Sequence, residues 1–148
     1  MAITPDALAG SVAFGTRYIQ CIVVGFETDI EEGTGKFYLH IPPGLDGMEL
    51  IASECHLRVI TAGSGSIVGV QFFLMHDPTS TSAGNNMLTT NLTIDNGEVD
   101  SSQDTAAVVN ATYKEVNTND MIRIDVIDNG GDSTIAKGLI VTLGFRLP

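Results

Sequence analysis

Apolar and polar residues alternate in short runs along this chain, and each run ends in residues that favour turns. The pattern is clearest in residues 48–61. Within this run, over residues 54–59, one side of an extended chain carries apolar side chains, namely Cys55, Leu57 and Val59. The opposite side carries polar ones, namely Glu54, His56 and Arg58. Because the side chains of a strand point alternately to its two faces, this period of two predicts a strand with one buried face.

Two runs near the C-terminal end repeat this period. In residues 120–128, apolar and charged positions alternate. The apolar residues are Ile122, Ile124 and Val126, and the charged residues between them are Arg123 and Asp125. In residues 139–147, one face is apolar throughout, and it consists of Leu139, Val141, Leu143, Phe145 and Leu147. Both runs are therefore predicted to be strands that contribute one face to a core.

In all, eight runs of β-forming residues follow one another, and they are residues 17–27, 36–41, 48–61, 67–76, 87–94, 105–112, 120–128 and 139–147. Gly, Asn and Asp separate them, as in Gly63-Ser64-Gly65 and Asp95-Asn96-Gly97. These residues tolerate the positive φ angles of tight turns, and Asn-Gly between apolar runs predicts a hairpin.

This pattern predicts an all-β protein with about eight antiparallel strands in a β-sandwich. A jelly roll is the natural eight-stranded arrangement, because it folds the strand edges into two facing sheets. An immunoglobulin-like sandwich is the alternative, but the chain has no Trp and lacks the Cys-Trp-Cys spacing of that fold. The jelly-roll-like sandwich is the better prediction.

The length of 148 residues is that of one domain. We assign residues 17–148 to a single β-sandwich domain and residues 1–16 to a short N-terminal arm. The arm carries four apolar side chains outside the predicted strands, and these are Ile3, Leu8, Val12 and Phe14. Exposed apolar groups on an acidic protein favour contact with a partner, so these four residues are the predicted partner interface.

The charge narrows the possible partners. The chain has 18 acidic and 7 basic residues, with a formal net charge of −11 and no basic run. Such a surface repels phosphate groups, so we expect no binding to nucleic acid or to an anionic membrane surface. The apolar runs are too short for a membrane helix, and the first residues lack the features of a signal peptide. The sequence predicts a protein made and kept in a cytoplasm, or released by lysis.

The two cysteines, Cys21 and Cys55, lie in apolar strand-like surroundings. Buried cysteines commonly act as small apolar residues. A disulfide would be possible if their strands were neighbours, although a cytosolic origin argues against it. No cysteine or histidine spacing matches a zinc site, and we expect no cofactor.

Acidic residues gather in two predicted loops. The first group is Glu27, Asp29, Glu31 and Glu32, and the second is Asp95, Glu98, Asp100 and Asp104. Two carboxylates at a suitable separation could hydrolyse a glycoside, but acidic residues in loops are usually just solvated.

Two other kinds of site can be compared with known patterns. A calcium site is conceivable at Asp125, Asp128, Asn129 and Asp132, although the ligand order of an EF-hand is absent. The histidines available for a nucleophilic triad are His40, His56 and His76, but no G-x-S-x-G elbow accompanies them. The sequence predicts no catalytic residues and no metal site, and we do not expect an enzyme.

Carbohydrate binding is the stronger functional alternative, because jelly rolls often serve as lectins. Exposed aromatic side chains commonly form sugar platforms. Three tyrosines could line such a groove, namely Tyr18, Tyr38 and Tyr113. Tyrosine in a strand is equally typical of the sheet surface itself.

Three segments of the second half share a pattern of strands and turns, and they are Asn86–Glu98 (NMLTTNLTIDNGE), Asn119–Val126 (NDMIRIDV) and Ala136–Phe145 (AKGLIVTLGF). These segments resemble small virion structural proteins of tailed bacteriophages, in which the series ML-T-x-L-x-I-D-x-G-E, D-x-I-R-I-D-V and K-G-L-x-V-x-L-x-F recur. The resemblance covers roughly residues 36–148 and is a pattern of strands and turns without a catalytic fingerprint.

The resemblance implies a jelly-roll-like domain on a phage particle, as a head decoration or cement protein or as a fibre module. It also implies a homotrimer that binds the major capsid protein or another virion protein. The alternative that it leaves open is a receptor- or glycan-binding module of a tail or head fibre. A glycoside-processing enzyme is the least favoured interpretation.

Overall fold

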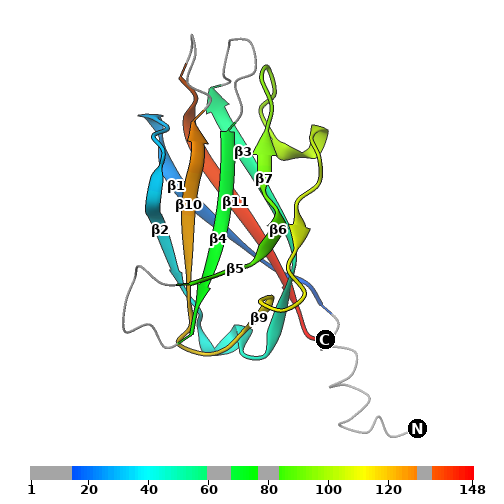
Figure 1. Ribbon diagram of the computed structural model, residues 1–148. Helices are drawn as coiled ribbons and strands as arrows, with labels where there is room; N and C mark the ends of the chain where they lie inside the picture. The colour runs from blue at the N-terminus through cyan, green and yellow to red at the C-terminus, as the bar shows by residue number, and fades with distance from the viewer. Residues whose placement is uncertain (1–14, 60–67, 77–83, 130–134) are drawn as a thin grey trace, which may run out of the picture.

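A computed structural model describes residues 15–59, 68–76, 84–129 and 135–148, which form an all-β structure of two antiparallel sheets (Figure 1). Sheet A consists, in spatial order, of β1 (Arg17–Asp29), β11 (Lys137–Arg146), β3 (Met48–Val59) and β9 (Glu115–Val116). Sheet B consists of β2 (Gly33–His40), β10 (Met121–Asn129), β4 (Val68–Met75) and β5 (Asn85–Asn86), with β7 (Leu92–Ile94) also paired to β4. A small third sheet joins β6 (Leu88–Thr90) to β8 (Val108–Val109).

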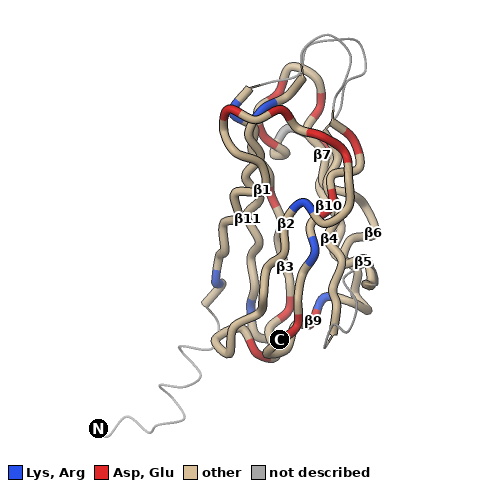
Figure 2. Tube along the Cα trace, turned by 90° about the vertical axis from the view of Figure 1, so that its left-hand side faces the viewer, with Lys and Arg blue, Asp and Glu red and all other residues tan. Residues whose placement is uncertain are grey.

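The two large sheets pack face to face as a β-sandwich. Two short 3₁₀ turns, η1 (Pro43–Leu45) and η2 (Ser101–Gln103), lie in the connections. Among the described residues, no helix is long and apolar enough to cross a membrane. Acidic residues line much of the end of the sandwich that lies away from the C-terminus and from the start of β1 (Figure 2).

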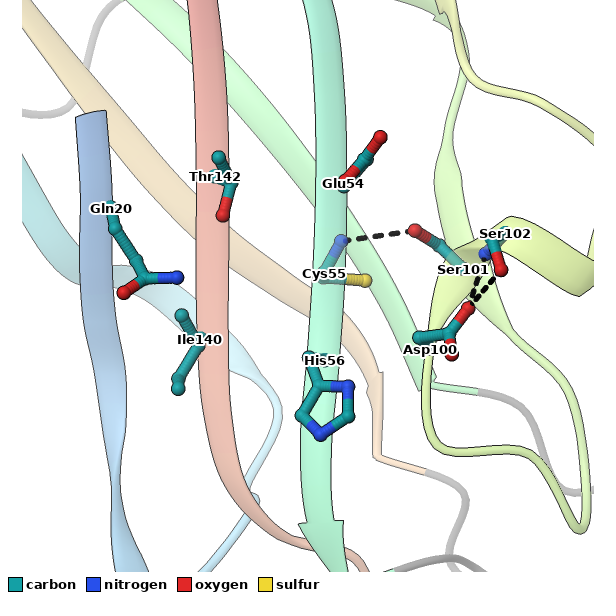
Figure 3. A pocket seen from close by; sticks show the side chains of 9 residues that line it. All are labelled: Gln20, Glu54, Cys55, His56, Asp100, Ser101, Ser102, Ile140 and Thr142. Carbon is teal, nitrogen blue, oxygen red and sulfur yellow. Dashed lines mark hydrogen bonds between the residues drawn. The ribbon is translucent and has the colours of Figure 1, made fainter. Parts of the chain in front are cut away.

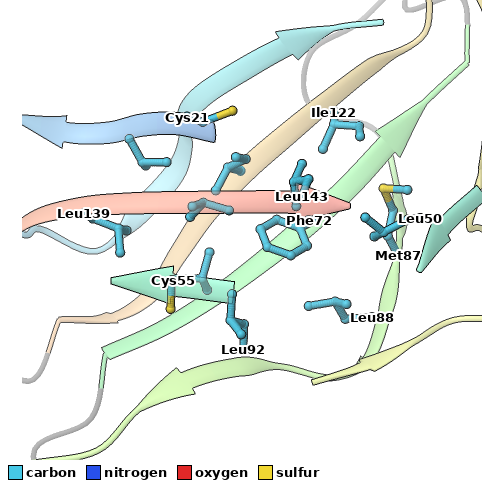
Figure 4. Close-up of a cluster of buried hydrophobic side chains, with 14 of the residues drawn as sticks. Cys21, Leu50, Cys55, Phe72, Met87, Leu88, Leu92, Ile122, Leu139 and Leu143 are labelled. Carbon is cyan, nitrogen blue, oxygen red and sulfur yellow. The ribbon is translucent and has the colours of Figure 1, made fainter. Parts of the chain in front are cut away.

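The core lies between the two sheets and is built from every second residue of the long strands (Figure 4). Sheet B contributes Val70, Phe72, Leu74, Ile122 and Ile124, among others. Sheet A contributes, among others, Leu50, Leu57, Leu139, Val141, Leu143 and Phe145. Burying one such side chain fully stabilises the fold by about 1.5–3 kcal/mol, so the predicted period of two has its physical reason in this shared core.

The predicted alternation is confirmed in three of the longest strands. Cys55 and Leu57 of β3 are buried while Glu54 and His56 are exposed. The apolar positions predicted for 120–128 and 139–147 line the core on β10 and β11, with Leu147 partly buried beside it.

The prediction of one strand over residues 87–94 is wrong. The segment is divided between β6 and β7, and Met87, which is buried like Leu88, lies before β6. Asn91 separates the two short strands, and its side-chain oxygen accepts a hydrogen bond from Gln71 at 2.9 Å.

The predicted strand over residues 105–112 is also much too long. Only Val108–Val109 pairs, as β8. Asn110 ends it, since its side-chain oxygen accepts the backbone N–H of Thr112 at 3.0 Å and its carbonyl accepts that of Tyr113 at 3.2 Å. An Asn side chain that bonds the backbone two residues on is typical of a turn.

The turn at Asp95-Asn96-Gly97 is present, and the two runs that flank it do pair antiparallel, as β6 with β8, but the turn does not join these two strands directly. Gly97 has a φ of +85°, and the N–H of Glu98 donates to the carbonyl of Asp95 at 3.2 Å. The chain then passes from sheet B to the edge of sheet A, where the carbonyl of Val99 accepts the N–H of Leu57 at 2.7 Å. The turn therefore links the two sheets of the sandwich.

Some predictions fall outside the described residues. These are the partner interface of the arm at Ile3, Leu8, Val12 and Phe14, the turn at Gly63-Ser64-Gly65, and the position of Asp132. The first described strand, β1, begins at Arg17, the first residue assigned to the sandwich domain.

Both cysteines are buried and unbonded, as small apolar residues of the core. They do not lie on neighbouring strands, because Cys21 of β1 and Cys55 of β3 both pair with Val141 of the strand between them. Two strand spacings separate their Cα atoms by about 9–10 Å, beyond the reach of a disulfide. Burial raises the pKa of the Cys55 thiol to about 12, so it stays protonated at neutral pH.

One ion pair is buried on the outer face of sheet B. As predicted, Arg123 and Asp125 of β10 alternate with the core residues and therefore lie on the outer face of the sheet. Even so, they are only 5% and 3% exposed. The guanidinium donates twice to the carboxylate, each time at 2.8 Å, and the N–H of Gly35 donates to it at 2.7 Å. Phe73 lies beside Arg123, with 4.6 Å from the guanidinium carbon to the ring centre.

Candidate functional site

The outer face of sheet A carries a hollow whose floor is made by three strands (Figure 3). Strand pairing places Gln20, Thr142 and Glu54 side by side in one row across β1, β11 and β3. The next row begins with Ile22 and Ile140 and continues to His56 and to Asp100 beyond the strand edge. The hollow has a volume of about 420 Å³.

The wall of the hollow is formed by η2, which lies against the edge of β3. The hydroxyl of Ser101 accepts the backbone N–H of Cys55 at 3.0 Å, in the place of a neighbouring strand. Asp100 precedes the turn, and its carboxylate accepts hydrogen bonds from the hydroxyl of Ser102 and from its N–H at 2.8 Å. The hydrogen bond from the hydroxyl of Ser102, followed by the one from its N–H, lowers the pKa of Asp100. The carboxylate that faces the hollow is therefore negatively charged.

A second hollow of about 500 Å³ continues from the first, since both include His56 and Ile140. It is lined mainly by apolar groups, including Phe26 and Val99. Arg58 lies at its border and is held by Glu27 at 2.8 Å. The two hollows together form a trough, polar at one end and apolar at the other.

Tyr18 lies on the same face, one row beyond Gln20, and is 67% exposed. Its ring covers Gly144 of the neighbouring strand, because a Cβ at Gly144 would come within 2.9 Å of the ring carbon Cε1. A side chain at position 144 would therefore displace the ring from the sheet. The glycine lets an exposed aromatic ring lie against the sheet beside the polar row.

The three predicted tyrosines do not form one groove. Tyr38 lies on β2 of sheet B, and Tyr113 lies in the turn that follows β8. Only Tyr18 lies on the face that carries the trough. Strand order, which the local sequence does not reveal, separates the three side chains.

The first acidic group is not a loop cluster. Glu27 and Asp29 lie on β1, where they pair with Arg58 and with Lys137 at 2.8 and 2.9 Å. Glu31 is 4.0 Å from Lys36. The structure thus uses these carboxylates in separate surface ion pairs.

The second acidic group does come together. Asp104 accepts the backbone N–H of Asp95 at 2.7 Å. Burial, followed by the nearby charges of Asp95 and Glu98, raises the pKa of Asp104 to about 6. The native protein thus binds a proton here between about pH 4 and 6, where an unfolded aspartate does not.

We expect the Asp104→Asn variant to be more stable than the wild type at pH 7.5 by about 1 kcal/mol after allowance for solvent screening. The wild type should gain stability as the pH falls from 7.5 through 6 toward 4, because it takes up this proton, and the variant should lack that gain. Urea unfolding at a series of pH values measures the difference.

The matched control is Asp100→Asn, because hydrogen bonds lower the pKa of Asp100. Loss of the Asp100 carboxylate should reduce the free energy of unfolding at neutral pH. This difference from the wild type should shrink on acidification below about pH 4. Equal pH profiles for wild type and Asp104→Asn would refute the assignment of the proton to Asp104.

The predicted calcium ligands are not assembled as a site in the described residues. Asp125 accepts hydrogen bonds from Arg123 and from the N–H of Gly35, and Asp132 lies outside the described residues. The histidines are also apart, with His56 on sheet A while His40 and His76 lie at one end of sheet B. Among the described residues, no three His, Cys, Asp or Glu side chains gather as a metal site would need.

Sequence reasoning missed the trough because its residues come from four separate segments. The alternation in β3 did identify Glu54 and His56 as outward-facing.

Comparison of the chain with protein-family models, curated proteins and solved structures found no significant match.

Proposed function

We propose that the protein is a virion structural protein of the tailed-phage type, and specifically a capsid decoration or cement protein. The three segments that resemble such proteins correspond to β5–β7, β10 and β11. β10 and β11 occupy interior positions in the two sheets. The resemblance thus concerns residues that build the framework of the domain.

The order of the strands supports a jelly roll. In sheet A the first long strand lies beside the last, and in sheet B the second lies beside the last but one. Successive strands β1, β2, β3 and β4 alternate between the sheets. Two sheets interleaved in this way are what a rolled-up pair of Greek keys gives. We infer that the sandwich belongs to this type.

The observation that carries the proposal is the exposed edge of β1. Over the described residues, this strand of 13 residues pairs with β11 on one side only. Its outward-facing apolar side chains include Ile22 and Phe26. A long apolar edge is an aggregation hazard unless another chain covers it. In a protein that functions in an assembly, a neighbouring chain covers such an edge.

The proposed partners are further copies of the chain, in a homotrimer, and the major capsid protein. In a closed three-fold ring the edge of β1 would meet a different surface of the next copy. The arm at residues 1–16 would contact the capsid through Ile3, Leu8, Val12 and Phe14. Binding to the assembled shell and not to its free subunits would stabilise the shell by mass action.

Light scattering tests the assembly. We expect the wild type to have three times the 15.6 kDa mass of one chain. The Ile22→Lys variant should be a folded monomer, because Ile22 is 54% exposed on the edge strand and a lysine there opposes strand pairing. Circular dichroism checks that the variant stays folded.

The control is Val108→Lys, a similar change at a side chain 49% exposed on β8, which should keep the wild-type mass. A wild type that is monomeric at all concentrations would contradict self-association. An Ile22→Lys variant that keeps the wild-type mass would contradict the role of β1.

The second candidate is a receptor- or glycan-binding module of a tail or head fibre. The specific observation in its favour is the trough on sheet A, with its polar row beside an exposed tyrosine. Concave sites with a few convergent polar groups are the usual form of ligand sites.

A further inference from the structure

We propose that the polar hollow on sheet A binds a neutral saccharide, with Tyr18 as the stacking platform and Glu54 and Asp100 as acceptors for sugar hydroxyls. This inference names the ligand of the second candidate function and rests on it. It does not depend on the assembly role of β1.

The polar groups match the chemistry of a sugar edge. A carboxylate only accepts hydrogen bonds, so it can take one from each of two adjacent hydroxyls. Glu54 and Asp100 provide two such groups from different segments, and Gln20 and Thr142 add side chains that both donate and accept. The bonds from Ser102 fix the carboxylate of Asp100 before any ligand arrives. Such fixation lowers the entropy cost of binding.

Tyr18 matches the other side of a sugar. The C–H groups on one face of a pyranose ring are apolar, and they pack well against an aromatic ring. Because the Tyr18 ring lies over Gly144, its outer side is open to solvent one row from Gln20. A ring stacked on Tyr18 would have its hydroxyls beside the polar row.

The charge selects the kind of saccharide. The described residues that line the polar hollow include two carboxylates and neither lysine nor arginine. The whole chain carries a net charge of −11. An acidic sugar would be repelled, so the hollow suits neutral hexoses. Its volume of about 420 Å³ lies within the range of about 300–1,000 Å³ that is usual for small ligands.

The test is a printed array of neutral and acidic oligosaccharides, followed by saturation-transfer NMR with glucose, galactose and mannose at millimolar concentration. We expect signals from neutral sugars alone. Tyr18→Ala and Glu54→Gln should each weaken binding roughly tenfold or more, equivalent to about 1.4 kcal/mol. Tyr113→Ala is the control, because Tyr113 is an exposed tyrosine that lines neither hollow.

Light scattering on the same samples separates this test from that of the assembly. Loss of sugar binding at an unchanged mass supports the saccharide site whatever that mass is. Absence of binding by the folded wild type, a preference for acidic sugars, or equal binding by Tyr18→Ala would each overturn it, and none of these results would bear on the β1 edge.

Discussion

Replacement of Asp125 by alanine is expected to destabilise the protein by about 3–5 kcal/mol, because it removes the carboxylate that accepts two hydrogen bonds from the buried guanidinium of Arg123. The carboxylate accepts two hydrogen bonds from Arg123 and one from the N–H of Gly35, all at 2.7–2.8 Å. Removing it takes away the acceptor of these three hydrogen bonds. Since domains are stable by about 5–15 kcal/mol, the loss could unfold much of the population, and urea unfolding measures it.

Two further variants distinguish this effect from the simple loss of a charge. Asp29→Ala breaks the exposed pair with Lys137 and should cost less than about 1 kcal/mol. The double change of Arg123→Met with Asp125→Leu should recover most of the stability, because well-packed apolar groups often replace a buried pair at little cost. A loss below about 1 kcal/mol for Asp125→Ala would contradict the burial of the pair.

Replacement of Phe72 by alanine should have a comparable effect, with a loss of about 3–5 kcal/mol. Phe72 is completely buried between the sheets, beside Ile124 of β10 in the register of sheet B. Truncation removes its favourable transfer from water and leaves a cavity that the two rigid sheets can fill only in part. Thermal and urea unfolding should both report the loss.

Phe26→Ala provides the matched comparison, since Phe26 is a phenylalanine on the outer face of sheet A. Its truncation should cost only about 1 kcal/mol, because Phe26 is 45% exposed and so loses much less buried surface than Phe72. Equal losses for the two variants would mean that the core does not lie between the sheets as described.

The long strands could be predicted because every second residue of each one is apolar and packs in the core. β3, β10 and β11 carry this period in their own sequences, and the structure has them where the period predicts. The short strands β6–β8 could not be predicted in this way. Their positions depend on buried neighbours and on asparagine turns, which break the period.

The burial of Arg123 and Asp125 could not be predicted from the local sequence pattern either. Alternation places both on the outer face of β10, as expected, but their neighbours Tyr38 and Phe73 come from β2 and β4. The register between these strands therefore decides that the pair is buried. A charge pair two residues apart in a strand was the one available sequence signal, because such residues share a face.

The candidate site required the same long-range information. Gln20, Glu54, Asp100 and Thr142 become neighbours only through the order of β1, β11 and β3 and the connection that crosses from sheet B. Sequence reasoning identified Tyr18 as a possible platform but could not pair it with Gly144. The glycine is one of several, and its role depends on the strand beside it.

The exposed edge of β1 is central to the proposed role in an assembly, and amide hydrogen exchange on the full chain examines it directly. At concentrations where light scattering finds a trimer, the β1 amides that point away from β11 should be protected. They should exchange rapidly after dilution to the monomer, while those bonded to β11 stay protected throughout. Rapid exchange of the outward-pointing amides at every concentration would contradict a covered edge, and with it the proposal that this domain assembles through β1.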